Sequence, residues 1–486
     1  MESKHFDVVV VGAGISGIGA GYYLQTKSPN KTFCIIEGRD NIGGTWDLFQ
    51  YPGIRSDSDM FTLGYAFKPW TDRKSIADGP SILSYLKETV KENNLEKKII
   101  FSHKVRSASW DSSKSEWTLE VTNNANEEIA YVTCNFLFTG TGYYNYDSGY
   151  TPEFQSLDKF NGQIIHPQKW PKDLNYEDKK VIVIGSGATA ATIVPEISKK
   201  SKHVTMLQRS PTYYFPSLDE DRFANFLKKI LPTKLSYSFI RLRNVLFQQL
   251  LYRICRRFPN FVKRKLIDHV REMLPNFDIQ KHFTPSYNPW EQRMCLIPNG
   301  DLFESLRENR ATIVTDHIDE FTQNGIKLKS GTELNADIIV TATGLNLQQF
   351  GGIQLSIDGE QINPADTMTY KSMMFSGIPN FVNSFGYINA SWTLKADLTC
   401  EFACRLINYM DKNNYKHCVP TIPSDVKAED DWLATEFSSG YIHRAIHLFP
   451  KQGNRSPWIN TQNYVKDFLG IKYGRLHDDS MQFAKR

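Results

Sequence analysis

Two segments of the chain place small residues at the spacing that lets a backbone approach a pyrophosphate. Residues 12–17 read Gly-Ala-Gly-Ile-Ser-Gly, and residues 185–190 read Gly-Ser-Gly-Ala-Thr-Ala. Each follows a run of β-branched residues, at 8–11 and 181–184, which predicts a buried strand, a tight turn and a helix. The phosphates of a dinucleotide bind at the positive end of such a helix. Two such turns predict two dinucleotides on one polypeptide, the arrangement that passes a hydride between them.

The residues that end the next strand after each turn predict which dinucleotide binds there. After the first turn this strand ends at Glu37, an acid expected to bind a ribose diol, as the adenosine of FAD requires. After the second turn it ends in Gln208, Arg209 and Ser210. A carboxylate would repel a 2′-phosphate there, whereas a guanidinium beside a hydroxyl would pair with it. We therefore predict FAD at the first turn and NADPH, rather than NADH, at the second, with a solvated surface arginine as the alternative for Arg209.

The candidate cofactor-binding residues of these two segments are the small residues of each turn and the residues that end each following strand. Val105, on a later predicted strand, is expected to line the adenine of the first cofactor. The set is Gly12, Gly14, Ser16, Gly17, Glu37, Val105, Gly185, Ser186, Gly187, Ala188, Thr189, Ala190, Gln208, Arg209 and Ser210.

Composition limits the class of protein. A chain of 486 residues is too long for one core, so two or three domains are expected. Its 41% hydrophobic and 23% charged residues are ordinary for a soluble globular protein, and a net charge of +4 does not indicate nucleic-acid binding. We expect no signal peptide and no membrane span, because no apolar run approaches about 20 residues. Seven cysteines without framework spacing favour a reducing compartment, so a cytoplasmic protein is expected.

Two further apolar strands, at 136–142 and 338–344, end in small residues, and each follows a plausible β-meander. Each would close one nucleotide-binding domain and pass the chain to the other. We predict an α/β fold with two Rossmann-like dinucleotide-binding domains and a helical insertion in the second. The predicted parts are an FAD-binding domain at 1–143 and 380–486, an NADPH-binding domain at 144–210 and 293–379, and the insertion, or lid, at 211–292.

Two longer signatures carry a resemblance to a known family. Residues 43–57 fit G-G-x-W-x-x-x-x-Y-P-G-x-x-x-D, and residues 160–171 fit F-x-G-x-x-x-H-x-x-x-W-P at every specified position. Over essentially its whole length the chain resembles the Baeyer–Villiger monooxygenases, which are class B flavoprotein monooxygenases. It is most similar to the ethionamide-activating type, through residues 287–293, 342–347 and 389–397. Ala190 departs from the glycine that many members carry, which we interpret as subtype variation.

The resemblance implies an enzyme that reduces FAD with NADPH and adds O2 to the flavin as a C4a-peroxyflavin. That species would insert one oxygen atom next to a ketone carbonyl to give an ester or lactone, with sulfoxidation of thioethers and thioamides as a side activity. The expected partners are therefore O2 and a small apolar ketone or sulfide, without nucleic acid.

The resemblance also implies the catalytic residues. An anionic peroxide and a tetrahedral alkoxide both need a fixed cation in a dry pocket, and the family's catalytic arginine maps onto Arg293. Asp57 is expected to lie beside it and hold it, with an ordinary ion pair as the alternative for both. Further cofactor contacts expected from the first signature are Gly44, Thr45, Trp46, Asp47, Leu48, Arg55, Ser56 and Asp57.

Three other functions compete with this one. Flavin-containing N- and S-oxygenases without ketone activity share the first signature but usually carry another aromatic in place of Trp170-Pro171. A regulator would bind FAD without consuming NADPH. A disulfide reductase needs a cysteine pair after the Gly-Gly-Thr segment, where the chain has no cysteine between Cys34 and Cys134.

Some residues whose types could do chemistry are expected to have structural roles. His166 belongs to a signature that resembles a linker between the nucleotide-binding domains, so we expect it to organise backbone rather than act as a base. Cys400 and Cys404 lie one helical turn apart and are expected to be buried spectators rather than a redox or metal pair. No histidine–cysteine cluster has metal-ligand spacing.

Residues 223–274 of the insertion are rich in Leu, Ile and Phe at helical spacing and are strongly basic. The simpler interpretation is a helical lid over the active site, as the resemblance implies. The alternative is peripheral contact with an anionic membrane, which suits apolar substrates. It depends on whether the apolar positions point inward or outward.

Overall fold

The computed structural model describes residues 4–429 and 439–485, and the largest sheet in that part of the chain has nine strands. Its centre is parallel, and strands there are buried on both faces, as their β-branched and aromatic residues favour. The strand order is β20-β19-β4-β5-β6-β1-β2-β3, with β23 also beside β6. The strands are β1 (Lys4–Val11), β2 (Phe33–Ile36), β3 (Ile99–Ile100), β4 (His103–Asp111), β5 (Glu116–Asn123), β6 (Ile129–Thr139), β19 (Gln354–Ile357), β20 (Glu360–Ile362) and β23 (Phe381–Asn383).

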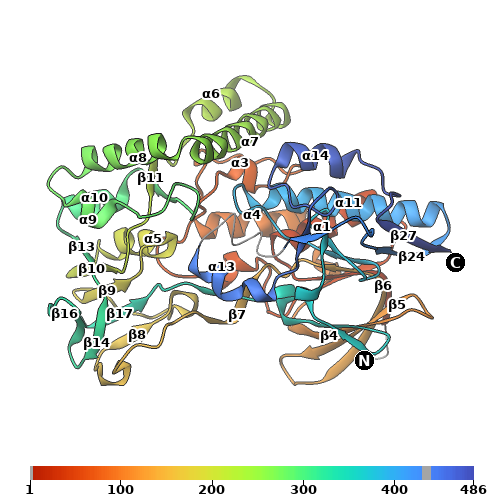
Figure 1. The fold of residues 1–486 in the computed structure, drawn as a ribbon, viewed down its shortest axis with the longest axis horizontal. Helices are drawn as coiled ribbons and strands as arrows, with labels where there is room; N and C mark the ends of the chain where they lie inside the picture. Colours follow the sequence, from red (N-terminus) through yellow and green to blue (C-terminus); the bar gives the residue numbers. More distant parts are fainter. Residues whose placement is uncertain (1–3, 430–438, 486) are drawn as a thin grey trace.

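Helices cover one face of this sheet (Figure 1). α1 (Ile15–Lys27) packs against α11 (Trp392–Lys412), and α4 (Gly79–Glu92) lies beside α1. Because successive strand residues point to opposite faces, Val8 and Val10 join the core under these helices, while Val9 packs on the other face with Trp117. On α11, Leu398, Phe402 and Leu406 belong to the same core.

The second sheet of the described residues has five parallel strands in the order β13-β10-β9-β17-β8. They are β8 (Gln163–Ile165), β9 (Lys180–Ile184), β10 (His203–Gln208), β13 (Ala311–Thr315) and β17 (Ile338–Thr341). One face packs against α5 (Ala188–Ile197), α9 (Ile279–Phe283) and α10 (Asp301–Arg307), and the other against β14 (Ile318–Thr322), β15 (Gly325–Leu328) and β16 (Glu333–Asn335). The predicted α/β fold with two Rossmann-like sheets is confirmed.

Two short strands run between the sheets and pair with each other. β7 (Tyr144–Gly149) follows β6 of the first sheet, and β18 (Leu345–Leu347) follows β17 of the second. The two crossings of the chain therefore lie side by side and are antiparallel. The predicted domain boundaries stay a prediction. β19 and β20 fall within 293–379, which was assigned to the NADPH-binding domain, but they join the first sheet. The reason is that β19 pairs with the free edge of β4.

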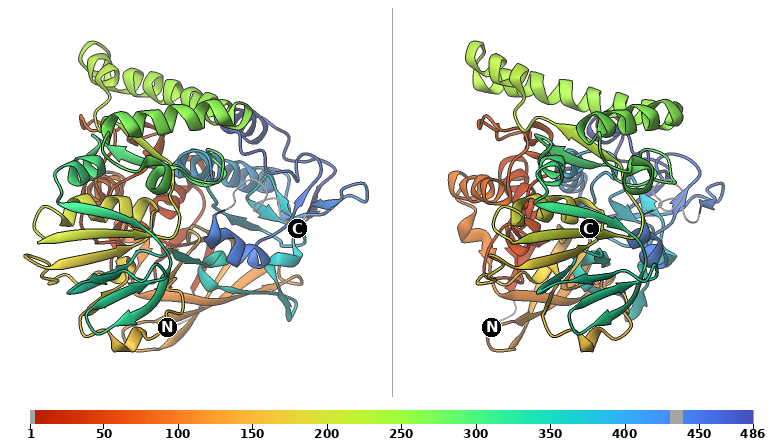
Figure 2. Two further views of the ribbon diagram at one scale, coloured as in Figure 1. Left: turned by 60° about the vertical axis from the view of Figure 1, so that its left-hand side comes forward. Right: turned by 90° about the vertical axis from the view of Figure 1, so that its left-hand side faces the viewer.

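A layer of helices lies across the top of the molecule and follows the second sheet's β10 in sequence (Figures 1 and 2). It consists of α6 (Arg222–Ile230), α7 (Thr233–Arg257) and α8 (Pro259–Met273). β11 (Tyr214–Ser217) and β12 (Cys295–Pro298) flank the helices and pair with each other. α7 packs on α3 (Met60–Leu63) of the first domain's chain, so this layer contacts both nucleotide-binding regions.

The C-terminal part returns to the first sheet. α14 (Tyr464–Lys472) packs on α11, and β24 (Tyr415–Pro420) pairs with β27 (Met481–Lys485). α13 (Gly440–Ala445) lies instead against β18, between the two sheets. The remaining short elements are α2 (Thr45–Leu48), β21 (Thr369–Tyr370), β22 (Met374–Phe375), β25 (Ala428–Glu429) and β26 (Gln452–Gly453). None of the helices described is both long and apolar enough to cross a membrane.

Candidate active site between the two glycine-rich turns

The first turn needs its glycines for steric reasons. Gly12 has φ +98°, and a Cβ there would lie 2.8 Å from the Gly140 carbonyl oxygen. A Cβ on Gly17 would lie 1.7 Å from the Gly12 carbonyl oxygen, so α1 can pack this close to the turn only with glycine. Gly14 is the N-cap of α1, and no side chain of the described residues caps the helix there. The first N–H groups of α1 are therefore available to an anion.

Glu37 is held at the end of β2 by backbone. Its side chain is buried and accepts hydrogen bonds from the N–H of Ala13 at 2.6 Å and the N–H of Arg39 at 2.9 Å. Burial raises the pKa of the Glu37 carboxyl, while the two N–H groups oppose that shift. Each carboxylate oxygen keeps acceptor capacity beyond its one backbone donor, so a ribose diol can still donate to it.

The second turn leaves open space next to its backbone. Gly185 has φ +140°, and a Cβ there would lie 2.4 Å from the Ala342 carbonyl oxygen. Gly187 is the N-cap of α5, and a Cβ on it would meet no atom of the described residues within 4 Å. Among those residues no side chain caps α5 either. A phosphate therefore has both the room and the N–H donors that it needs at this turn.

One cavity of about 550 Å³ extends from the first turn to the second. It reaches Glu37 at one end and Thr189 at the start of α5 at the other. The sequence-predicted residues that line it are Gly12, Gly14, Ser16, Glu37, Gly44, Thr45, Trp46, Leu48, Arg55, Ser56, Asp57, Val105, Ala188, Thr189 and Arg293. The predicted residues outside its lining are Gly17, Asp47, Gly185, Ser186, Gly187, Ala190, Gln208, Arg209 and Ser210.

Arg293 and Asp57 form an ion pair on the wall of this cavity. The Arg293 Nη1 donates to Asp57 Oδ2 at 2.8 Å, although 236 residues separate the two in sequence. Their side chains are 38% and 34% exposed, and both residues line the cavity. The Asp57 carboxylate raises the pKa of Arg293 further above its ordinary value, so the guanidinium keeps its charge. The arrangement is a fixed cation that faces the cavity between the two turns.

An aromatic wall beside this pair was not predicted from the sequence. The hydroxyls of Tyr143 and Tyr144 hydrogen-bond to each other at 2.8 Å, and burial raises the pKa of both. Tyr143 stacks on Trp392 with ring centroids 5.3 Å apart, and the Trp392 Nε1 donates to Ser16 Oγ at 2.8 Å. The position of the two tyrosines directly after the strand end at 136–142 was a usable signal. Nothing local connected Trp392 to the first turn.

Three predicted cofactor contacts have protein partners in the structure. Arg55 pairs with Asp301 in the first turn of α10, and Asp47 pairs with Arg39. Gln208 is 1% exposed, and its Nε2 donates at 2.8 Å both to the His282 carbonyl oxygen and to Thr315 Oγ1. A cofactor contact at Gln208 would therefore not use its side-chain amide, because this group is directed into the second domain.

A second cation lies beside Arg209 at the edge of the second turn. Arg209 is exposed at the end of β10, and Arg444 comes from α13, far along the chain. The guanidinium of Arg444 lies 3.5 Å from the centroid of the Tyr150 ring. Burial lowers the pKa of Arg444, and the nearby charge of Arg209 adds to that shift. The sequence pattern could not reveal Arg444, because no motif connects α13 to this turn.

His166 joins the two crossings of the chain. Its Nε2 donates to the Gly344 carbonyl oxygen at 3.1 Å, and its Nδ1 accepts from the N–H of Gln168 at 3.2 Å. A Cβ on Gly149 would lie 1.9 Å from the imidazole Cε1, so β7 passes directly over the ring. Burial lowers the pKa of His166, which favours the neutral ring that these two bonds require. The geometry agrees with the structural role expected for this residue.

No cysteine of the described residues lines the cavity. All seven are unpaired and buried, and burial raises the pKa of Cys404 to about 12. Within residues 4–429 and 439–485, no three His, Cys, Asp or Glu side chains are grouped so that they could hold a metal ion.

Comparison with known proteins gives a consistent result. A model of flavin-binding monooxygenase-like proteins matches residues 75–377, and a model of an NAD(P)-binding Rossmann-like domain matches residues 10–70. The chain is 50% identical over 486 residues to the FAD-containing monooxygenase EthA of Mycobacterium tuberculosis, covering 100% of this chain and 99% of the relative. It is 47% identical over 484 residues to the probable FAD-binding monooxygenase AlmA of Acinetobacter baylyi, covering 99% and 97%.

Solved structures show the same fold at low identity. An oxidised steroid monooxygenase bound to NADP superimposes with a TM-score of 0.80 at 22% identity, covering 99% of this chain and 100% of that chain. An open crystal structure of cyclohexanone monooxygenase gives a TM-score of 0.78 at 20% identity with the same coverage.

Proposed function

Because the chain belongs to the family of flavin-binding monooxygenases, we propose that it is a Baeyer–Villiger monooxygenase that uses FAD, NADPH and O2. It inserts one oxygen atom next to the carbonyl of a small apolar ketone to give an ester or lactone, and it oxidises thioethers and thioamides as a side activity. The observation that carries this proposal is the Arg293–Asp57 pair on the wall of a cavity that reaches both glycine-rich turns.

The residues at the first turn fit FAD. The uncapped N-terminus of α1 would bind the pyrophosphate, and Glu37 would accept from the ribose hydroxyls. Val105 lines the same end of the cavity, where the adenine would lie. When bound, the flavin would accept the electrons of NADPH and activate O2, chemistry that no side chain of the protein provides.

The residues at the second turn fit NADPH. The open space at Gly187 admits a pyrophosphate, and Arg209 lies where the 2′-phosphate of the ribose would bind. Arg444 would be the second cation for that phosphate, because its charge is already close to that of Arg209. A 2′-phosphate would neutralise both, whereas NADH offers no group that does so.

Arg293 would stabilise the negative charge that develops on the substrate oxygen during insertion. A guanidinium offers several donors in a fixed plane and keeps its charge at any working pH. Asp57 holds one of its nitrogens and leaves the others free to donate into the cavity. Such preorganised donors act most strongly where water is excluded. Tyr143 and Trp392 line the cavity with stacked aromatic rings, which would help to exclude water there.

Product analysis tests the proposed reaction. The purified flavoprotein is incubated in air with NADPH and either a simple ketone or a thioether, and products are identified by gas chromatography. We expect ester or lactone from the ketone and sulfoxide from the thioether. Sulfoxide without any ester would show an N- or S-oxygenase instead. Bound FAD without NADPH consumption on either substrate would indicate a cofactor-binding regulator.

A further inference from the structure

The apolar side of α7 points away from the protein. Its stripe of five residues has helical spacing of three or four, which places all five on one face. Each of them is more than half exposed. They are Leu235, Phe239, Leu242, Leu246 and Leu250. A surface helix usually presents polar side chains to solvent, so an outward stripe of five large apolar residues is unusual.

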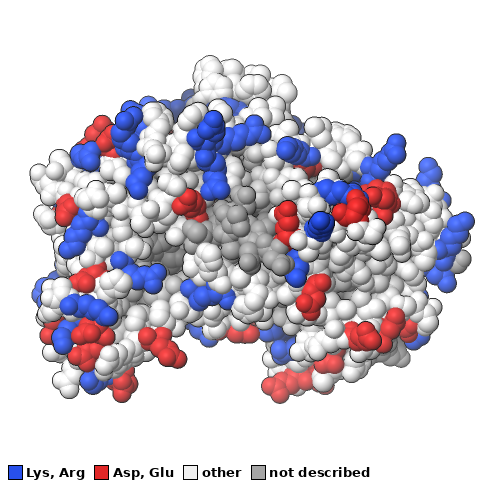
Figure 3. Space-filling model, in the orientation of Figure 1, with Lys and Arg blue, Asp and Glu red and all other residues white. Residues whose placement is uncertain are grey.

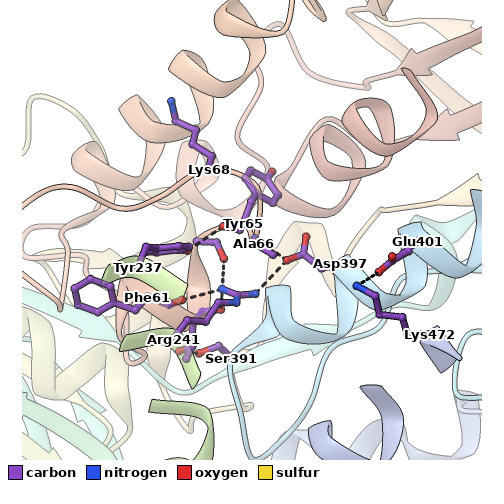
Figure 4. A network of polar contacts seen from close by, with 12 residues as sticks. Phe61, Tyr65, Ala66, Lys68, Tyr237, Arg241, Ser391, Asp397, Glu401 and Lys472 are labelled. Atoms are coloured by element: carbon purple, nitrogen blue, oxygen red, sulfur yellow. Dashed lines mark hydrogen bonds and ion pairs between the residues drawn. The ribbon is translucent and has the colours of Figure 1, made fainter. Parts of the chain in front are cut away.

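The opposite side of α7 is buried against the first domain, where apolar Ile240 and Val245 lie beside polar side chains that are hydrogen-bonded to that domain. Arg241 is buried and donates to the carbonyl oxygens of Phe61 at 2.8 Å and Gly64 at 2.7 Å, and to Asp397 Oδ2 at 3.1 Å (Figure 4). Asn244 Nδ2 donates to Asp59 Oδ1 at 2.8 Å. Turning the helix to bury its leucines would break the buried Arg241–Asp397 ion pair and leave its charges unpaired, which is strongly unfavourable. The outward apolar face is therefore a specified feature of the fold.

Neighbouring helices extend this face. α6 exposes three large apolar side chains. Phe258, which directly precedes α8, and Phe261 within α8 add two more. Together with α7 they form what we call the outer face: Phe223, Phe226, Ile230, Leu235, Phe239, Leu242, Leu246, Phe247, Leu250, Phe258 and Phe261. Figure 3 shows an uncharged protrusion on top of the molecule over α6 and α7, with Lys and Arg side chains near its base. A continuous apolar surface of this kind marks an interaction site rather than scattered exposure.

The segment that carries the outer face contains charges of one sign. Residues 222–267 include twelve Lys or Arg and no Asp or Glu. Arg253 and Arg257 continue the helical stripe of α7 beyond Leu250. The exposed cations are Arg222, Lys229, Lys234, Arg253, Arg256, Arg257, Arg264 and Lys265. Apolar side chains bordered by cations match a bilayer whose headgroups are anionic. A second copy would bring the same cations together in a symmetric contact, which is unfavourable.

We propose that the outer face binds the surface of an anionic lipid bilayer, with its apolar side chains among the acyl chains and its cations at the headgroups. The contact is peripheral, since none of the described helices meets the requirements for a membrane span. The proposal uses no step of the reaction, so it stands or fails separately from the proposed function.

Vesicle co-sedimentation of the full-length flavoprotein tests the apolar part of the surface. We expect binding to vesicles of phosphatidylglycerol and phosphatidylcholine, weak binding to phosphatidylcholine alone, and release by salt. Leu246→Ser/Phe247→Ser should lower the partition coefficient about tenfold or more, because two side chains leave the acyl region. These side chains are 51% and 58% exposed, so their loss removes little internal packing. The matched control is Tyr131→Ser/Ile129→Ser on β6. These two side chains have the same exposed fractions, 51% and 58%, and lie away from the outer face.

A second pair of variants tests the charge. Arg253→Gln/Arg257→Gln should weaken binding to anionic vesicles about tenfold or more and leave the weak binding to neutral ones unchanged. Lys199→Gln/Lys200→Gln at the end of α5 is the control. The proposal is overturned if the wild type does not bind anionic vesicles at low salt, or if the outer-face and control variants bind equally. It is also overturned if light scattering shows that Leu246→Ser/Phe247→Ser dissociates a dimer without any change in vesicle binding. The outer face would then bind a second copy of this chain rather than a bilayer.

Discussion

Replacing Arg444 with glutamine tests whether the C-terminal segment recognises the 2′-phosphate of NADPH. Arg444 lies over the ring of Tyr150, and burial together with the charge of Arg209 lowers its pKa. The two positive charges repel each other in the absence of an anion. A phosphate bound beside both would remove the repulsion and gain charge-assisted hydrogen bonds.

The size of the effect follows from those hydrogen bonds. A hydrogen bond to a charged group contributes about 1.5–3 kcal/mol, and about 1.4 kcal/mol corresponds to a tenfold change in affinity. We therefore expect Arg444→Gln to raise the dissociation constant of NADPH about 10- to 100-fold. The affinity for NADH should stay within about twofold, because NADH has no 2′-phosphate for Arg444 to bind.

Anaerobic reduction of the bound flavin, followed by its absorbance at increasing NADPH or NADH, measures both affinities. Arg444→Lys should recover part of the NADPH affinity, since it restores the charge but not the guanidinium plane. Arg475→Gln, at another exposed arginine of the C-terminal part, is the control and should change neither affinity. An equal loss of affinity for both nucleotides would show that Arg444 only packs α13 in place. Unchanged NADPH affinity would refute the assignment outright.

Three further predictions follow from the site and its supports. Arg293→Ala should lower the rate of ester formation about 100- to 1,000-fold while FAD stays bound; loss of FAD in the variant would instead indicate a structural role. Burial raises the pKa of Asp397 to about 6 despite its pairing with Arg241. Arg241→Ala should therefore lower the free energy of unfolding by about 3–5 kcal/mol in urea, and the exposed neighbour Ser238→Ala should not. Because burial holds the pKa of His166 below its usual 6.5, its contribution to stability is complete above that pH and is lost as the pH falls. The fall in melting temperature from about pH 7 to about pH 5 should be smaller in His166→Gln than in the wild type, and identical falls would contradict this.

The local geometry of the first turn could be predicted because it depends on residues that are close in sequence. Gly12, Gly17 and the strand before them act within a few residues of each other, so their steric need for glycine is visible in the motif itself. The pairing of Arg293 with Asp57 joins distant segments, and only the resemblance to a known family anticipated it. The functional assignments of these residues stay predictions.

The parts that were missed depend on tertiary placement. Trp392 reaches Ser16 from the start of α11, and Arg444 on α13 lies near enough to Arg209 for their charges to interact. Neither contact leaves a local pattern, because each depends on how two distant elements pack. Periodicity likewise showed that α7 has an apolar stripe but could not show which side of the helix faces the protein. That question was decided by Arg241, whose buried partners lie in the first domain.

The orientation of α7 also connects the proposed lipid surface to the candidate active site. Asn244 and Gln248, on the inner side of the helix, donate to the two carboxylate oxygens of Asp59 at 2.8 and 2.9 Å. Asp59 caps α3 and lies two residues after Asp57, the partner of Arg293. The helix that would lie on the bilayer therefore supports the loop that carries the ion pair. An apolar ketone dissolved in the membrane would be concentrated beside the enzyme, so turnover of such a substrate should rise when anionic vesicles are added, and Leu246→Ser/Phe247→Ser should remove that rise without changing turnover of a water-soluble ketone.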